Sequence, residues 1–455
     1  MALRRGTPLL RVLLLALAGG GGGACARAPQ PAAVTPAEIP GLLAQAQQQP
    51  QNAAVQLRLA AALAAAQRCD TATVIAKTAA GLEPANVLAP LIVGACEEQA
   101  GRYDEAIATY TDFVAQHPTA RGVAAVRAQA QIALRASAER TAQQALAREA
   151  ELASQPPEAA TVAVLPVVIA GDSSVQPLSR GLAKLITTDL AYIRMLRLLE
   201  RLQIGALVDE LKLGASERVD PATAARVGRL LRAERMVQGT ATIPAQGPVQ
   251  LSATVVTGTG VVRPAGQVTG PFPRLLDLEK QVVFDLASQL GIELTEAERQ
   301  RILRQGPKNL AAFLAYSRGL EDMDRGDYPG AARHFGAAAQ ADPSFQAAQQ
   351  GQQAATAAPA VQQASGGGIV TVVDAVERVT GASEPAGPAG AGEAGGGLLV
   401  TGTRDVVPSV GDVIGGSGLP TGASIIDRQH TPEALGLPSI LSVTNGITII
   451  FKRPP

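Results

Sequence analysis

A repeat of 34 residues near the start of the chain most constrains the fold. Three prolines mark it at equal intervals: Pro50, Pro84 and Pro118. Small residues recur in the same register: Ala60 and Gly94, Ala72 and Ala106. Small side chains let two helices cross closely, and a proline stops the second helix of a pair. We therefore expect residues 50–153 to form stacked pairs of α-helices.

The second unit contains the segment GRYDEAIATYTDFVAQHP and resembles the tetratricopeptide repeat (TPR). The glycine, alanine, aromatic and proline positions of that repeat are matched in turn by Gly94, Ala106, Tyr110 and Pro118. A further unit over residues 309–350 has the same spacing, isolated from the others by the segment between them: Gly319, Ala331, Phe335 and Pro343. The resemblance implies a groove that binds a peptide or partner protein. The alternative is a structural spacer.

Residues 1–24 have the pattern of a secretory signal peptide, with Arg4 and Arg5 before a short apolar run and then small residues. Small residues before Cys25 resemble the lipobox of bacterial lipoproteins, in which the cysteine is acylated. This resemblance implies lipidation of Cys25. Because Ala26 and not aspartate follows, it also implies an outer membrane lipoprotein facing the periplasm. Plain secretion without lipid is the alternative. Residues 25–49 are expected to be a linker and a first helix.

The remaining cysteines, Cys69 and Cys96, are placed at the end of one repeat's first helix and on the equivalent helix of the next repeat. Neighbouring repeats and an exported location favour a disulfide, while the offset along the helix axes opposes it. Two buried free thiols are the alternative. The cysteine spacing fits no zinc motif and the three histidines are isolated, so we expect no metal and no cofactor.

Strand and helix patterns alternate between residues 161 and 303, which predicts an α/β domain. Expected strands cover 161–171, 195–200, 235–243, 249–256 and 260–270. Expected helices begin at Leu178, Leu202, Pro221 and Leu275. Asp220 before Pro221 is a helix start, with the aspartate as N-cap and the proline at the first helical position.

Residues 196–243 carry a dense motif that resembles the CsgG-like domain of curli secretion and its relatives, the FlgO and TolB amino-terminal domains. The matching residues are Glu200, Arg201, Glu210, Leu211, Val219, Asp220, Thr223, Ala224, Ala225, Val227, Gly228, Val237 and Gly239. The resemblance implies a CsgG/TolB-N-like α/β domain over 161–303 that docks onto partners or oligomerises.

Channel-forming members of this family extend their strands into long hairpins that cross the membrane. Here the connection between residues 243 and 249 is a tight turn, and the segment 255–273 is short and holds three prolines. We therefore expect the family's fold without its pore. The sequence shows no Walker loop, no dinucleotide-binding glycine motif and no catalytic triad, so we expect no enzyme activity.

The end of the chain is expected to hold a flexible linker over 351–397 and a β-rich tail over 398–455. Asn445 and Gly446 suit the tight turn of a β-hairpin. Three interpretations of this tail stand: a small β-module, a strand donated to a partner's sheet, or a largely disordered segment.

These patterns together predict an α+β multidomain protein: an α-helical TPR array, a CsgG-like α/β domain and a small β-rich tail. The chain has 39 basic and 39 acidic residues, which excludes a strongly basic nucleic-acid binder. The leading hypothesis is a non-enzymatic envelope lipoprotein that acts as a periplasmic assembly or scaffold component. Its partners would be envelope proteins, further copies of the chain and the membrane. A curli-type outer-membrane secretion channel subunit is the alternative, and an envelope enzyme with an unrecognised site is a third hypothesis.

Overall fold

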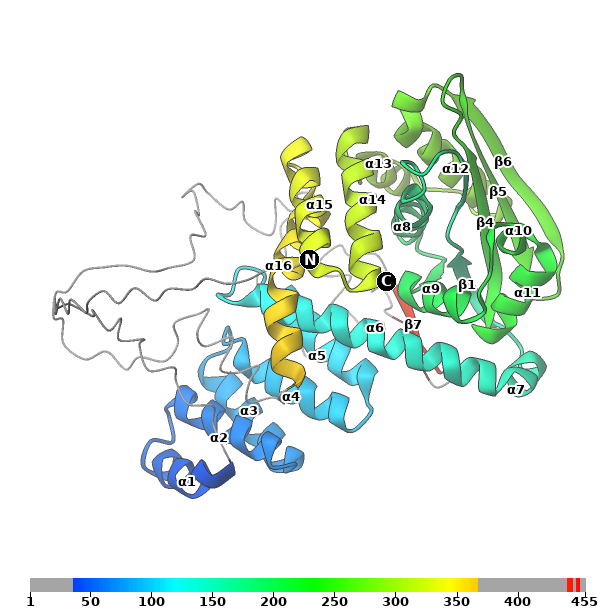
Figure 1. Cartoon of the computed structure of the whole chain (residues 1–455). Coiled ribbons are helices and arrows are strands. Elements are labelled where there is room, and N and C mark those ends of the chain that lie inside the picture. The colour runs from blue at the N-terminus through cyan, green and yellow to red at the C-terminus, as the bar shows by residue number, and fades with distance from the viewer. Residues whose placement is uncertain (1–35, 367–439, 445–446, 451–455) are drawn as a thin grey trace, which may run out of the picture. The chain divides into compact units, whose positions relative to one another are not determined.

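The computed structural model describes residues 36–366, 440–444 and 447–450 (Figure 1). The predicted signal peptide, Cys25, most of the predicted linker over 351–397 and most of the predicted β-rich tail over 398–455 lie outside these residues. None of the described helices combines the length and the apolar character needed to cross a membrane.

The first part of the chain is helical. It contains η1 (Pro36–Glu38), α1 (Ile39–Gln48), α2 (Ala53–Ala65), α3 (Cys69–Leu82), α4 (Leu88–Gln99), α5 (Tyr103–Gln116), α6 (Val123–Ala147) and α7 (Glu149–Ser154). Each helix from α1 to α6 packs against the next, as the period of 34 residues predicts. Alanines fill much of the core between them, which keeps the helix axes close.

The α/β domain follows α7. Its elements are β1 (Glu158–Val164), β2 (Val168–Ala170), α8 (Leu178–Leu190), β3 (Arg197–Leu199), α9 (Arg201–Glu210), α10 (Ala215–Val219), α11 (Pro221–Leu230), β4 (Ala233–Thr242), β5 (Val249–Thr257), β6 (Val262–Gly270), η2 (Phe272–Arg274), α12 (Leu275–Gln289) and α13 (Glu296–Arg304). The single strand predicted over 161–171 is in fact two strands, because Pro166 has no N–H for the sheet ladder.

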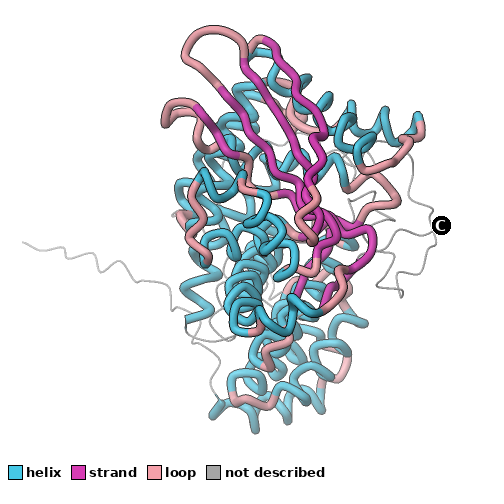
Figure 2. Tube along the Cα trace, turned by 90° about the vertical axis from the view of Figure 1, so that its right-hand side faces the viewer, coloured by secondary structure: helices cyan, strands magenta, loops and turns pink. Residues whose placement is uncertain are grey.

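The strands, magenta in Figure 2, form one mixed sheet. Their order is β6-β5-β4-β1-β3, and β2 also pairs with β4. Strands β2, β1 and β3 run parallel to their neighbours, while β4, β5 and β6 form an antiparallel meander. Helices cover both faces. Val162 and Val164 of β1 face the core with α8 and α12, while Ala163 and Leu165 face the core with α9 and α11.

Three long helices follow the domain: α14 (Leu310–Arg325), α15 (Tyr328–Ala341) and α16 (Gln346–Gly366). The prediction of a flexible linker is therefore wrong for residues 351–366. Alanine and glutamine dominate this stretch and favour a helix, and the alanine face packs against α15 and α6. Pro359 lies inside the helix without ending it.

A hairpin of two strands, β7 (Ile440–Thr444) and β8 (Ile447–Ile450), confirms the hairpin predicted around Asn445 and Gly446. Strand β7 pairs in parallel with β3, and so extends the sheet of the α/β domain. Within the described residues the hairpin is thus part of that sheet and not a separate β-module.

Candidate functional site

The helix pairs place the repeat residues as the spacing predicts. Gly94 on α4 faces the ring of Tyr110 on α5 so closely that an added Cβ would lie within 3.0 Å of it. Tyr110 is fully buried, and its hydroxyl donates a hydrogen bond to Glu98, 2.7 Å away. Ala106 is also fully buried. Glycine at position 94 therefore leaves the space that the Tyr110 ring occupies.

The unit formed by α14 and α15 repeats this arrangement. An added Cβ on Gly319 would meet the ring of Phe335, also within 3.0 Å, and Ala331 is fully buried. Tyr316 stacks obliquely on Phe335 and Phe345, with ring centroids 5.4 and 4.7 Å away. Both units thus use one glycine and one aromatic side chain, sixteen residues later, to set the distance between two helices.

The third unit is not isolated from the first two, contrary to the expectation from the sequence. Helix α16 packs on α6, with Ala358 and Val361 in one cluster with Ala128. Arg127 donates a hydrogen bond to Gln353, at 3.0 Å, across this contact. The two helical segments are separate in the sequence but join in space through α6.

Helix α6 also contacts the α/β domain. Ala142 and Ala145, near its C-terminal end, pack with Ile204 and Leu207 of α9. Buried residues lie around much of the circumference of α6, and its exposed residues are few: Gln131, Glu139, Arg140, Gln143 and Ala147. Helix α6 therefore packs against both the helical units and the α/β domain.

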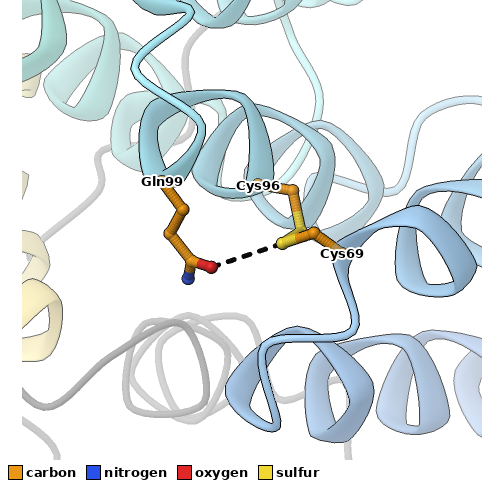
Figure 3. Close-up of a disulfide and its surroundings, with 3 residues drawn as sticks. All are labelled: Cys69, Cys96 and Gln99. Atoms are coloured by element: carbon orange, nitrogen blue, oxygen red, sulfur yellow. Dashed lines mark hydrogen bonds between the residues drawn. A yellow bond between two sulfur atoms is a disulfide. The ribbon is translucent and has the colours of Figure 1, made fainter.

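Cys69 and Cys96 form a disulfide, with their Cα atoms 5.4 Å apart (Figure 3). Cys69 is the first residue of α3 and not, as expected, the end of the preceding helix. That shift brings it level with Cys96 on α4 and removes the offset that opposed the bond. The amide oxygen of Gln99 lies 3.3 Å from the sulfur of Cys69. The disulfide links the first helix pair to the second.

The charged residues of the CsgG-like motif have structural partners. Glu200 caps α9 by accepting from the N–H of Leu202, at 3.3 Å. Asp220 caps α11 by accepting from the N–H of Thr223, at 2.9 Å, which confirms the predicted helix start. Both roles satisfy N–H groups that the helix itself leaves free.

Arg201 has a partner that the sequence did not suggest. It binds Asp324 of α14 through two hydrogen bonds of 2.6 and 2.8 Å, and Arg180 of α8 donates to the same carboxylate at 2.7 Å. The side chains of Arg201 and Asp324 are only 10% and 6% exposed. Burial by itself raises the pKa of Asp324, but the two guanidinium groups together hold that pKa below its ordinary value.

This ion cluster lies where α14 packs on α8. The close approach there depends on Gly181, because an added Cβ would collide with Ser317 of α14. The third helical unit is therefore tied to the α/β domain by packing and by charge. Asp324 lies 123 residues from Arg201 and 144 residues from Arg180 in the sequence, which is why spacing arguments missed the network.

A second buried cluster joins α8 to α12. The ammonium group of Lys280 donates to Asp189 and lies 3.5 Å from Glu279. Burial and the neighbouring Asp189 carboxylate raise the pKa of Glu279 to about 8. Neither carboxylate has exposed surface. The cluster is thus enclosed in the contact between α8 and α12.

Among residues 36–366, 440–444 and 447–450, no group of three histidine, cysteine, aspartate or glutamate side chains is placed to hold a metal ion. The Arg201–Asp324 and Lys280–Asp189 ion pairs described above each join two helices. The surface features that remain are the helical units and a polar cleft beside α10.

Residues 143–243 match the family model described as curli production assembly/transport component CsgG. The match runs from the C-terminal part of α6 to the end of β4, and includes the whole motif of residues 196–243. The expected CsgG-like domain is therefore confirmed, although the match begins earlier and ends sooner than the predicted range 161–303. No curated protein matches the sequence significantly.

Proposed function

Because the chain carries a CsgG-like domain, we propose that it is a non-enzymatic envelope lipoprotein that acts as a periplasmic assembly or scaffold component. The helical units bind a partner protein, and the CsgG-like domain docks onto envelope components or oligomerises. Cys25 carries the lipid that anchors the chain to the outer membrane. The name of the matched family, an assembly and transport component, supports this class of function.

One observation carries the proposal: helical units at both ends of the CsgG-like domain pack on that domain through α6 and α14. The Arg201–Asp324 ion pair and the close contact at Gly181 fix α14 on α8. A protein bound to the helical units is then held at a set position relative to the CsgG-like domain. Such positioning is what a scaffold contributes to an assembly.

The exposed lysines allow a direct test. Lys77 lies on α3 of the helical units, and Lys212 follows α9 in the CsgG-like domain; both side chains are exposed. Affinity purification from native envelopes, followed by lysine cross-linking and mass spectrometry, should join a partner protein to Lys77. If the partners are cross-linked at Lys212 and never at Lys77, the helical units are not the binding surface.

The anchor has its own test. The intact mass of the protein in the membrane fraction should equal a chain beginning at Cys25 plus acyl groups. A Cys25→Ser variant is the matched control and should leave the membrane fraction. A wild-type protein that begins at Cys25 without added acyl mass would refute lipidation.

The family match also favours a second candidate, a curli-type secretion channel subunit. Conductance across liposomes separates the two candidates. Purified protein that opens ion-conducting pores would overturn the scaffold proposal in favour of the channel, whereas a scaffold leaves the membrane resistance unchanged.

A further inference from the structure

A polar cleft of about 210 Å³ lies beside β2. It is lined by residues of β2, the start of α8, α10 and α14: Val168, Ile169, Gln176, Pro177, Ser179, Arg180, Ala215, Arg218 and Glu321. Strand β2 pairs in parallel with residues 240–242 of β4, past the residues of β4 that pair with β1, so the cleft lies beyond the carboxyl end of β1. In open α/β sheets, ligands commonly bind outside the carboxyl ends of the strands.

The charges around the cleft leave one positive group without a balancing ion pair. Arg180 is engaged by Asp324 and, at 3.6 Å, by Asp209. Glu321 is engaged by Arg325, at 2.8 Å. Arg218 has no carboxylate within ion-pair distance among the described residues.

The surroundings of Arg218 disfavour the charged form of its guanidinium group. Burial, and then the nearby guanidinium of Arg180, lower the pKa of Arg218. An anion that entered the cleft would offset both effects, because it would replace lost hydration and lie between two positive groups.

Neutral hydrogen-bonding groups complete the lining. The side-chain amide of Gln176 donates to the carbonyls of Ile169 and Gly171, at 3.3 and 3.1 Å, and so covers the free edge of β2. The hydroxyl of Ser179 also lines the cleft and bonds to no described residue. This hydroxyl can donate to an oxygen of a bound group. The planar guanidinium of Arg218, in the same lining, presents its N–H groups in a geometry that matches carboxylate and phosphate oxygens.

We propose that this cleft binds a ligand that carries a carboxylate or phosphate group, with Arg218 as the main anchor and Arg180 as a second positive contact. The volume is smaller than that of a typical drug-sized pocket, about 300–1,000 Å³. It therefore suits a compact anion or the charged end group of a larger molecule. The proposal does not depend on the scaffold function.

Calorimetric titration of the whole mature protein with inorganic phosphate, and separately with succinate, tests the proposal at constant ionic strength. At least one anion should bind saturably, and the tighter of the two identifies the phosphate or the carboxylate class. Arg218→Gln should weaken that binding by about tenfold or more, since it removes charge-assisted hydrogen bonds. Arg263→Gln, an exposed arginine on the outer strand β6, is the matched control and should bind as the wild type does.

Arg218 lies on a short surface helix, so its replacement should not disturb the core; the unfolding temperature checks this. Should Arg218→Gln fail to fold, Arg218→Lys keeps the charge without the fork and should still weaken binding. The proposal is overturned if neither anion binds saturably, if the Arg218 variants bind as the wild type does, or if Arg263→Gln weakens binding equally.

Discussion

Replacing Gly94 with alanine should destabilise the N-terminal helical units. The new methyl group would lie within 3.0 Å of the Tyr110 ring, which real Cβ atoms essentially never do. The ring cannot simply move aside, because Tyr110 is fully buried and its hydroxyl is bonded to Glu98. Burial already raises the pKa of Glu98, and the Tyr110 hydroxyl is one of two donors that stabilise its charged form. The substitution therefore strains the packing between α4 and α5 and also weakens the hydrogen bond between Tyr110 and Glu98.

The size of the effect follows from three contributions. Overpacking a well-filled core costs about 1–3 kcal/mol. Loss of a hydrogen bond to a charged group costs about 1.5–3 kcal/mol. Alanine in place of glycine in a helix returns about 1 kcal/mol. We expect a net loss of about 2–4 kcal/mol in the free energy of unfolding of this segment.

Hydrogen exchange of α4 and α5 is the suitable measurement, because it reports local stability in a chain with several cooperative units. Gly205→Ala is the matched control: Gly205 lies inside α9, and an added Cβ there meets nothing within 4 Å. This control should be neutral or stabilise by about 1 kcal/mol. A second change, Tyr110→Leu, should cost less in the Gly94→Ala background than in the wild type. If Gly94→Ala exchanges no faster than the wild type, the close helix crossing is not as described.

Three further outcomes are expected. Asp324→Asn should lower stability by about 3–5 kcal/mol in urea denaturation, because it leaves Arg201 buried without a carboxylate; a loss below 1 kcal/mol would show that the pair is not buried in solution. Glu279 binds its proton more tightly when folded, since its pKa rises from 4.5 to about 8, so the stability it contributes at low pH is lost as the pH rises through that window. Glu279→Gln should flatten the pH dependence of the unfolding temperature, and an unchanged slope would contradict the burial argument. Reducing the Cys69–Cys96 bond, which spans 27 residues, should cost about 3–4 kcal/mol by the loop-entropy estimate, and Cys69→Ser with Cys96→Ser should lose the sensitivity of the unfolding temperature to reductant.

Local signals in the sequence predicted most of the elements. The Asp220–Pro221 start of α11, the helix α8 and the strands β4, β5 and β6 lie within about two residues of their expected places, because caps and apolar periodicity act over a few neighbouring residues. The strand interrupted at Pro166 could have been recognised from the missing N–H. The repeat pattern also indicated where two helices pack closely, because Gly94 leaves room for the large Tyr110 side chain on the next helix.

Long-range contacts were not predictable in the same way. Nothing local to Arg201 indicates that its partner is Asp324, and nothing in α16 indicates that it packs on α6. The polar cleft likewise combines residues of the CsgG-like motif with segments before and after it, and nothing local to Arg218 indicates that it lines a cleft. These features depend on the tertiary arrangement, which a single sequence with no covariation does not specify.

Helix α6 has a mechanical consequence. Its 25 residues form a continuous rod of about 37 Å, with the repeat helices at one end and α9 at the other. Much of this rod is packed against neighbouring elements, so a bend in it would open a cavity. Any partner that tilts the repeat end must therefore displace α9 as well, and α9 begins with Arg201. Force applied to the repeats thus reaches the ion cluster on α14 along two routes, through α6 and through α16.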